Sequence, residues 1–84
     1  MKYDEIKNLF EAAVENAQYN NVEIDANYFS DYASNALDLS IGNELASCMM
    51  LLHCDVEKAK KDSSYSSDTY YYLCLANLNK FAEE

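Results

Sequence analysis

Four side chains of the types that bind zinc stand in the second half of the chain: Cys48, His53, Cys54 and Cys74. Thiolate and imidazole groups are preferred zinc ligands, and four is the number that a structural zinc site needs. On a shared helix, however, Cys48 and Cys54 would point about 120° apart, and His53 would face a third direction. One tetrahedral centre cannot collect side chains so dispersed. We therefore predict no metal site, and we interpret Cys48 and Cys74 as reduced core residues.

The other common arrangements for catalysis are missing from this sequence. His53 and Cys54 are neighbours, and neighbouring residues of a helix do not face each other as a nucleophile and its base must. With 15 carboxylates in 84 residues, pairs close in sequence are expected by chance, and none has an apolar setting. A phosphate-binding loop needs several glycines, whereas this chain has only Gly42. We predict a protein that is not an enzyme and uses no cofactor.

The charge balance favours one class of partner. The formal net charge is −9, and the 6 basic residues are all lysines, so bidentate recognition of phosphate by arginine is excluded. Nucleic acids and anionic membranes would be repelled, because attraction to phosphate dominates their binding. The composition therefore predicts a basic protein as the partner.

Cysteine use and the apolar runs indicate a cytoplasmic protein. Three cysteines cannot all pair within one chain, which favours a reducing compartment. The amino-terminal segment "MKYDEIKNLF" lacks the apolar block of a signal peptide. The most apolar run, "LASCMMLL", is far shorter than the ~20 residues of a membrane span. Abundant Asn, Tyr and Lys further suggest an AT-rich genome, such as that of a low-GC bacterium or its phage.

Helical periodicity predicts four helices, at about residues 4–20, 26–39, 44–61 and 68–81, in one domain. Asp4 and Asp25 are expected to cap the first two. Gly42 is expected to close the second helix in a left-handed conformation, with Asn43 capping the third. Ser67 and Asp68 follow the serine-rich loop "DSSYSS" and are expected to open the fourth.

One apolar face on each helix is expected to form the core. Short connections favour antiparallel neighbours, so the fold class is all-α, a small four-helix bundle that is up-and-down or slightly irregular. The residues expected to be buried are Ile6, Leu9, Phe10, Ala13, Val14 and Ala17; Phe29, Tyr32, Ala33, Ala36 and Leu37; Leu45, Cys48, Met49, Leu52, Val56 and Ala59; and Tyr71, Cys74, Leu75, Leu78 and Phe81.

Several apolar side chains exceed what one core face can take. Met50 and Leu51 fall on a second side of the third helix, Tyr72 and Leu73 fall off the stripe of the fourth, and Tyr65 stands in the loop. One interpretation is that the third helix is central and wrapped by the other three. The other is a patch for self-association or partner docking, to which tyrosine is well suited because it offers large area with few rotamers.

Carboxylates form a line on the first helix and project from the second. They are Asp4, Glu11 and Glu15, followed by Asp31 and Asp38. They are either a solvated face that keeps the protein soluble or a surface complementary to a basic groove. Carboxylates four residues apart rise about 6 Å along a helix, a spacing comparable to that of successive phosphates, so the second interpretation includes mimicry of nucleic acid.

These features favour a non-enzymatic inhibitor of a basic nuclease or CRISPR effector. In size, charge and lack of catalytic groups the chain resembles phage-encoded anti-CRISPR and anti-restriction proteins. With Tyr70, Tyr71 and Tyr72 it also resembles the immunity proteins of nuclease bacteriocins. That family carries its tyrosine pair on a short third helix followed by proline, whereas here the tyrosines begin the last helix and proline is absent. The alternative is a helical adaptor or homodimer that associates through Met50, Leu51, Tyr72 and Leu73.

Overall fold

Four α-helices make up most of the chain, and the prediction of an all-α fold is confirmed. The computed structural model describes residues 1–82. The helices are α1 (Tyr3–Asn20), α2 (Ala26–Ala36), α3 (Asn43–Lys61) and α4 (Ser67–Leu78), and a 3-10 turn, η1 (Asn79–Phe81), extends α4. Residues 1–82 contain no strand and no helix long and apolar enough to cross a bilayer.

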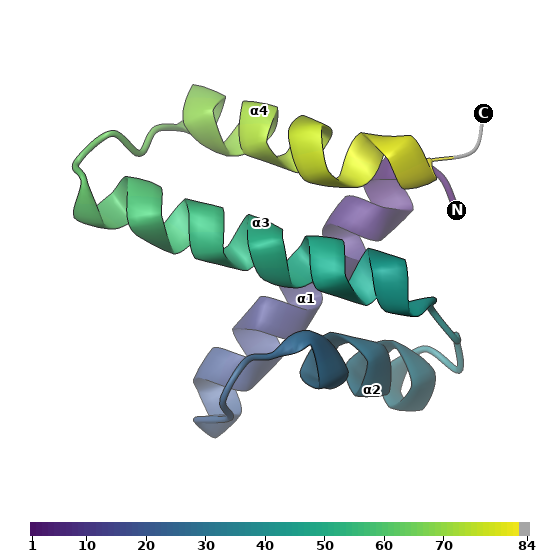
Figure 1. Cartoon of the computed structure of the whole chain (residues 1–84). Coiled ribbons are helices and arrows are strands. Elements are labelled where there is room, and N and C mark those ends of the chain that lie inside the picture. Colours follow the sequence, from purple (N-terminus) through teal and green to yellow (C-terminus); the bar gives the residue numbers. More distant parts are fainter. Residues whose placement is uncertain (83–84) are drawn as a thin grey trace.

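The helices form two layers. α2, α3 and α4 lie side by side with α3 in the middle, each antiparallel to its neighbour, and α1 runs obliquely behind them (Figure 1). The extents of 36 × 34 × 17 Å fit a slab two helices thick. The predicted four-helix bundle is therefore confirmed, and its irregularity is the crossing of α1. The third helix is in the middle of its layer, but the other three helices do not wrap it on all sides within residues 1–82. Because α1 lies on one side of the layer, no helix within residues 1–82 covers the opposite face of α3.

The ends of α1 and α3 are set by residues in the left-handed conformation. Asn21 has φ 56° and Ser63 has φ 58°. Beyond them the Val22 N–H donates to the Ala17 carbonyl at 2.9 Å, and the Ser64 N–H donates to the Ala59 carbonyl at 3.1 Å. These six-to-one bonds satisfy carbonyls that a helix end would otherwise leave free. Both helices consequently end close to where the sequence predicted.

α2 is shorter than predicted, and its last turn was assigned wrongly. The helix ends at Ala36, because Asp38 turns left-handed with φ 49°. The reversal lets the Leu39 N–H reach the Ala33 carbonyl at 3.0 Å and brings the Leu39 side chain against the core. Ala36 and Leu37, which we expected to be buried, are exposed instead.

Two helices start from side-chain caps. The Asp25 carboxylate accepts the Tyr28 N–H at 2.7 Å, as predicted for α2. On α4 the cap is Ser66, one residue before the expected Ser67, and its hydroxyl accepts the Thr69 N–H at 3.1 Å. Each cap satisfies one of the free N–H groups of a first turn.

Three predicted caps were wrong: Asp4, Gly42 and Asn43. Lys2 is the cap residue of α1, so Asp4 lies inside the first turn, where its charge complements the helix dipole. Gly42 has φ −70° and serves as the extended cap residue of α3, rather than as a left-handed end of α2. Asn43 is consequently the first residue of α3. We predicted a left-handed backbone conformation for Gly42, and Asp38 has that conformation instead.

The core lies where α1 crosses α3. Ile6, Met49 and Leu52 are fully enclosed, and the Phe10 ring stacks on the Phe29 ring with centroids 5.7 Å apart. Burial of the other predicted core residues is confirmed for Leu9, Ala13, Ala17, Ala33, Leu45, Cys48, Val56, Ala59, Cys74 and Leu78, while Val14, Tyr32, Leu75 and Phe81 are half-buried. One side of α1 therefore seals the layer of three helices.

The inward face of α4 differs from the prediction by one residue. Tyr71, expected in the core, is 51% exposed, and its ring meets that of Tyr72 edge-on at 5.5 Å. Tyr70 turns inward instead, in line with Cys74 and Leu78 at intervals of four residues. α4 is apolar on most of its sides, so periodicity alone did not identify the buried side. Because α4 is rotated about its axis in this way, the Tyr70 hydroxyl lies next to α1.

Two adjacent leucines of α3 provide a matched test of the fold. Leu52 is fully buried and Leu51 is 57% exposed. We predict that Leu52→Ala lowers the free energy of unfolding by about 3 kcal/mol through lost burial and a cavity. Leu51→Ala should lower it by less than about 0.5 kcal/mol. Urea denaturation followed by circular dichroism measures both, and equal losses would contradict the placement of α1 over α3.

Candidate functional site

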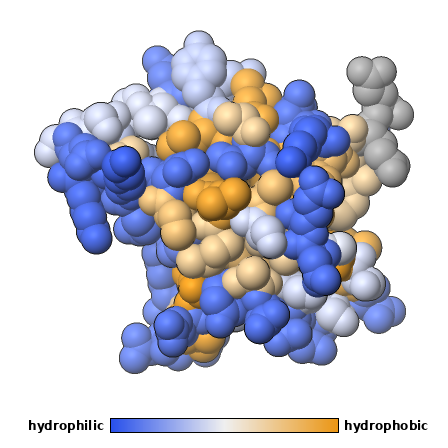
Figure 2. Space-filling view, viewed as in Figure 1, coloured by the Kyte–Doolittle hydropathy of each residue, from blue (hydrophilic) through white to orange (hydrophobic). Residues whose placement is uncertain are grey.

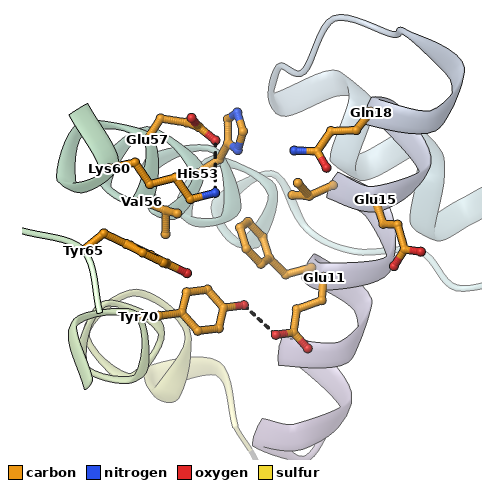
Figure 3. Close-up of a pocket in the computed structure, with 11 residues that line it drawn as sticks. Glu11, Glu15, Gln18, His53, Val56, Glu57, Lys60, Tyr65 and Tyr70 are labelled. Atoms are coloured by element: carbon orange, nitrogen blue, oxygen red, sulfur yellow. Dashed lines mark hydrogen bonds and ion pairs between the residues drawn. The ribbon is translucent and has the colours of Figure 1, made fainter. Parts of the chain in front are cut away.

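A groove opens beside the crossing of α1 and α3, where the loop before α4 closes its third side. Its volume is about 330 Å³. Phe10 and Val14 from α1 and Val56 from α3 supply its apolar lining, and polar side chains surround them (Figure 3). The groove is therefore a consequence of the oblique path of α1, which diverges from α3 towards its own carboxyl end.

Acidic side chains border this groove from two helices. Glu11 and Glu15 come from α1, and Glu57 comes from α3. Glu11 pairs with Lys7 at 3.6 Å and Glu57 with Lys60 at 4.0 Å. Within residues 1–82, Glu15 is exposed and has no hydrogen-bond or ion-pair partner. The border of the groove is negative, and Glu15 is available to a ligand.

Two tyrosines form the third side. The rings of Tyr65, in the loop, and Tyr70, on α4, lie 6.4 Å apart between centroids. The Tyr70 hydroxyl donates to Glu11 Oε2 at 2.8 Å, and the side chain is half-buried. Burial, and then this bond to a carboxylate, raise the pKa of Tyr70 well above its ordinary value of 10.0. Tyr65 is 40% exposed and offers ring surface to the groove.

Lysines of the chain itself lie against both rings. The Lys7 ammonium is 5.9 Å from the centroid of Tyr70, and the Lys60 ammonium is 5.3 Å from that of Tyr65. Both distances are within the range of cation–π attraction. Each ammonium therefore contacts one ring and one glutamate, and the groove has the electrostatics of a site for cations.

The residues with catalytic or metal-binding side chains do not converge. His53 is half-buried at the groove, Cys54 is exposed, and Cys48 and Cys74 are buried free thiols as predicted. Burial raises the pKa of the Cys74 thiol above its ordinary 9.0. In the described part of the chain no three His, Cys, Asp or Glu side chains could share a metal ion. The arrangement can bind a ligand through charge and ring surface.

The predicted acidic surface is divided by the fold. Glu11 and Glu15 meet Tyr65 in the groove. Asp31 borders a separate hollow between α1 and α2, while Asp4 lies in the first turn of α1 and Asp38 in the turn after α2. The groove thus unites two of the five acidic residues with one tyrosine of the apolar set.

The predicted apolar patch is partly covered. Met50 and Leu73 are half-buried and pack against the core. Leu51 is 57% exposed and Tyr72 is 67% exposed. Apolar surface crosses the middle of α3 on the face turned away from α1 (Figure 2). Burial thus accounts for Met50 and Leu73, while Leu51 and Tyr72 are left exposed.

Sequence reasoning missed five polar residues of the groove: Gln18, His53, Glu57, Lys60 and Tyr70. His53, Glu57 and Lys60 recur at intervals of four and three residues, so they share one stripe of α3. That stripe was visible in the sequence as a polar edge beside Val56. Its approach to Tyr65 and Tyr70 depends on tertiary packing.

A scan of protein-family models and searches of curated proteins and solved structures gave no match.

Alkaline titration tests the Tyr70–Glu11 contact. The pKa values of Tyr3, Tyr70 and Cys74 are raised in the folded state, chiefly by burial, above their ordinary 10.0, 10.0 and 9.0. The unfolded chain releases these protons first, so we predict a stability that is complete below about pH 9 and falls as the pH rises further. Tyr70→Phe should cost about 1 kcal/mol at pH 7 and make that fall shallower.

Urea midpoints at pH 7, 9 and 10.5 measure the effect. Tyr72→Phe is the matched control, because Tyr72 is mostly exposed. A Tyr70→Phe variant whose stability falls as steeply as that of the parent would contradict the assignment.

Proposed function

We propose that this chain is a non-enzymatic acidic inhibitor, which binds and blocks the basic surface of a nuclease or another complex that handles nucleic acid. The observation that carries the proposal is the groove, where the ring of Tyr65 and Glu15, a carboxylate with no partner within residues 1–82, border one hollow. The net charge of −9 supports it, because the whole molecule repels phosphate and attracts lysine and arginine.

Electrostatic complementarity favours a protein that binds nucleic acid as the partner. Proteins that bind nucleic acid carry lysine and arginine along the path of the backbone. An acidic helical surface is complementary to that path, which speeds association at low salt and excludes acidic competitors. Tyrosine adds desolvated contact area with few rotamers to immobilise, and is enriched among the residues that dominate binding energy.

The α1 side of the groove also supports mimicry of nucleic acid. Glu11 and Glu15 are one helical step of four residues apart, which is a rise of about 6 Å. Like charges at this spacing cost a helix roughly 0.2–0.5 kcal/mol. Lys7 offsets part of that cost at Glu11, while Glu15 stays exposed. The proposal includes inhibitors of restriction and CRISPR effectors, and of bacteriocin nucleases.

Charge reversal with a matched control tests this function. The protein is offered to a panel of basic nucleases and CRISPR effectors, and captured partners are assayed for inhibition. We predict that Glu15→Lys weakens binding about tenfold or more, because the close ion pairs of an interface carry large coupling energies. Asp31→Lys makes the same charge change at the separate hollow and should weaken binding less.

Salt separates the electrostatic mechanism from other kinds of binding. Raising the salt concentration from 50 to 500 mM should lower the association rate steeply. Binding that is indifferent to salt, or lost equally in both variants, would contradict the proposed site. Failure to inhibit any member of the panel would contradict the function.

Self-association is the second candidate function, and the uncovered face of α3 favours it. Leu51 of α3 is exposed, and apolar surface crosses the middle of α3 (Figure 2). Contiguous apolar surface of this kind often marks an interface between proteins. In this second candidate function the chain forms a homodimer, or it acts as an adaptor that binds another helical protein.

Sedimentation tests the second candidate. We predict a dimer that Leu51→Glu dissociates, because a carboxylate buried at the interface would lack a partner. Lys58→Glu, which changes an exposed residue of α3, is the control for a general effect of charge. A strict monomer at high concentration would rule out the homodimer.

A further inference from the structure

The groove holds a cation of its own. The Lys60 ammonium lies 5.3 Å from the centroid of the Tyr65 ring and 4.0 Å from Glu57 Oε1. Figure 3 shows Lys60 and Glu57 reaching from α3 towards the hollow, with Tyr65 facing them from the loop. Ring and carboxylate thus define a position for a positive group, and the chain fills it with its own lysine.

The contacts of Lys60 with Glu57 and Tyr65 are weak. The side chains of Lys60 and Glu57 are 48% and 42% exposed, and their separation is at the limit of an ion pair. Pairs with this exposure contribute little to stability, because water competes for both charges. Lys60 also lies in the last turn of α3, where its charge complements the helix dipole whether or not it touches Tyr65. The ammonium can leave the ring at small cost.

We propose that the groove is the receptor for an arginine side chain of the basic partner, and that Lys60 occupies this position only until the arginine arrives. The inference rests on the proposed function and specifies its contact. The guanidinium would lie on the Tyr65 ring with Glu57 at its edge. Glu15, which has no partner within residues 1–82, provides a second carboxylate on the opposite side of the groove.

Arginine fits this position better than lysine does. Its planar guanidinium stacks on an aromatic face, is weakly hydrated, and binds a carboxylate through two parallel N–H groups. A second lysine would bring only the compact, strongly hydrated charge that Lys60 already supplies. The groove of about 330 Å³ is at the small end of ligand pockets, which suits one side chain.

The arginine site can be tested by measuring how easily arginine displaces Lys60 from the groove. Tetra-arginine peptide is titrated into isotopically labelled protein at low salt, and the dissociation constant is read from the backbone amide resonances of the residues that line the groove. We predict that Lys60→Gln tightens binding about threefold to fivefold, the equilibrium factor of one exposed cation–π contact. Lys61→Gln removes the same charge one residue further on, outside the groove, and should give a smaller gain.

The ring is tested separately. Tyr65→Leu should weaken tetra-arginine binding by a similar factor, and Tyr65→Phe should restore it, because a phenyl face also attracts cations. Tetra-lysine peptide should bind more weakly than tetra-arginine. Its affinities for the parent and for Tyr65→Leu should also differ less than those of tetra-arginine. Circular dichroism confirms that each variant is folded.

The outcomes separate this inference from the proposed function. Equal gains for Lys60→Gln and Lys61→Gln, or full binding by Tyr65→Leu, would overturn the arginine site while inhibition of a nuclease could still stand. Conversely, a Tyr65-dependent arginine site in a protein that inhibits no member of the panel would leave the inference intact and remove the proposed function. Tetra-lysine that binds as tightly as tetra-arginine would overturn the preference for guanidinium.

Discussion

The structure depends on one constraint: a single helix, α1, covers a layer of three. Because α1 crosses that layer obliquely, its apolar side seals only the middle, where Phe10 stacks on Phe29. Hollows remain on both sides of the crossing, one towards α3 and α4 and the other towards α2. In the described part of the chain, residues 1–82, no helix covers the far face of α3. Every candidate surface in this protein therefore results from the same shortage of cover.

Two tyrosines hold α1 in place from opposite sides. The Tyr28 hydroxyl on α2 donates to the Ala13 carbonyl at 2.6 Å and accepts from Asn16 at 3.0 Å. The Tyr70 hydroxyl on α4 donates to Glu11 at 2.8 Å. Hydrogen bonds to partly buried groups are worth more when the acceptor is charged. The contact that ties α4 to α1 thus also fixes the Glu11 carboxylate at the border of the groove.

Sequence reasoning succeeded where one apolar stripe of a helix is clearest. The core of α1 followed from periodicity because polar residues bound its stripe, and the main stripe of α3 was also identified although Met50 and Leu51 lie outside it. On α4 the run from Tyr70 to Leu75 is apolar all round, so Tyr71 was chosen where packing selects Tyr70. The end of α2 depends on the left-handed Asp38, which no local signal distinguished. The groove could not be derived at all, since it joins residues about fifty positions apart through the angle of α1.

The distribution of lysine explains how so acidic a chain stays folded while keeping a negative surface. Lys7, Lys60 and Lys80 each lie over an aromatic ring and within 4.0 Å of a glutamate. They relieve repulsion where carboxylates border packed elements, and the rings keep these ammonium groups close to the protein. Exposed carboxylates such as Glu15 and Asp31 are left to set the outward field. The basic partner that we propose would meet this field first and the ring-bound lysines afterwards, an order that suits exchange of one cation for another.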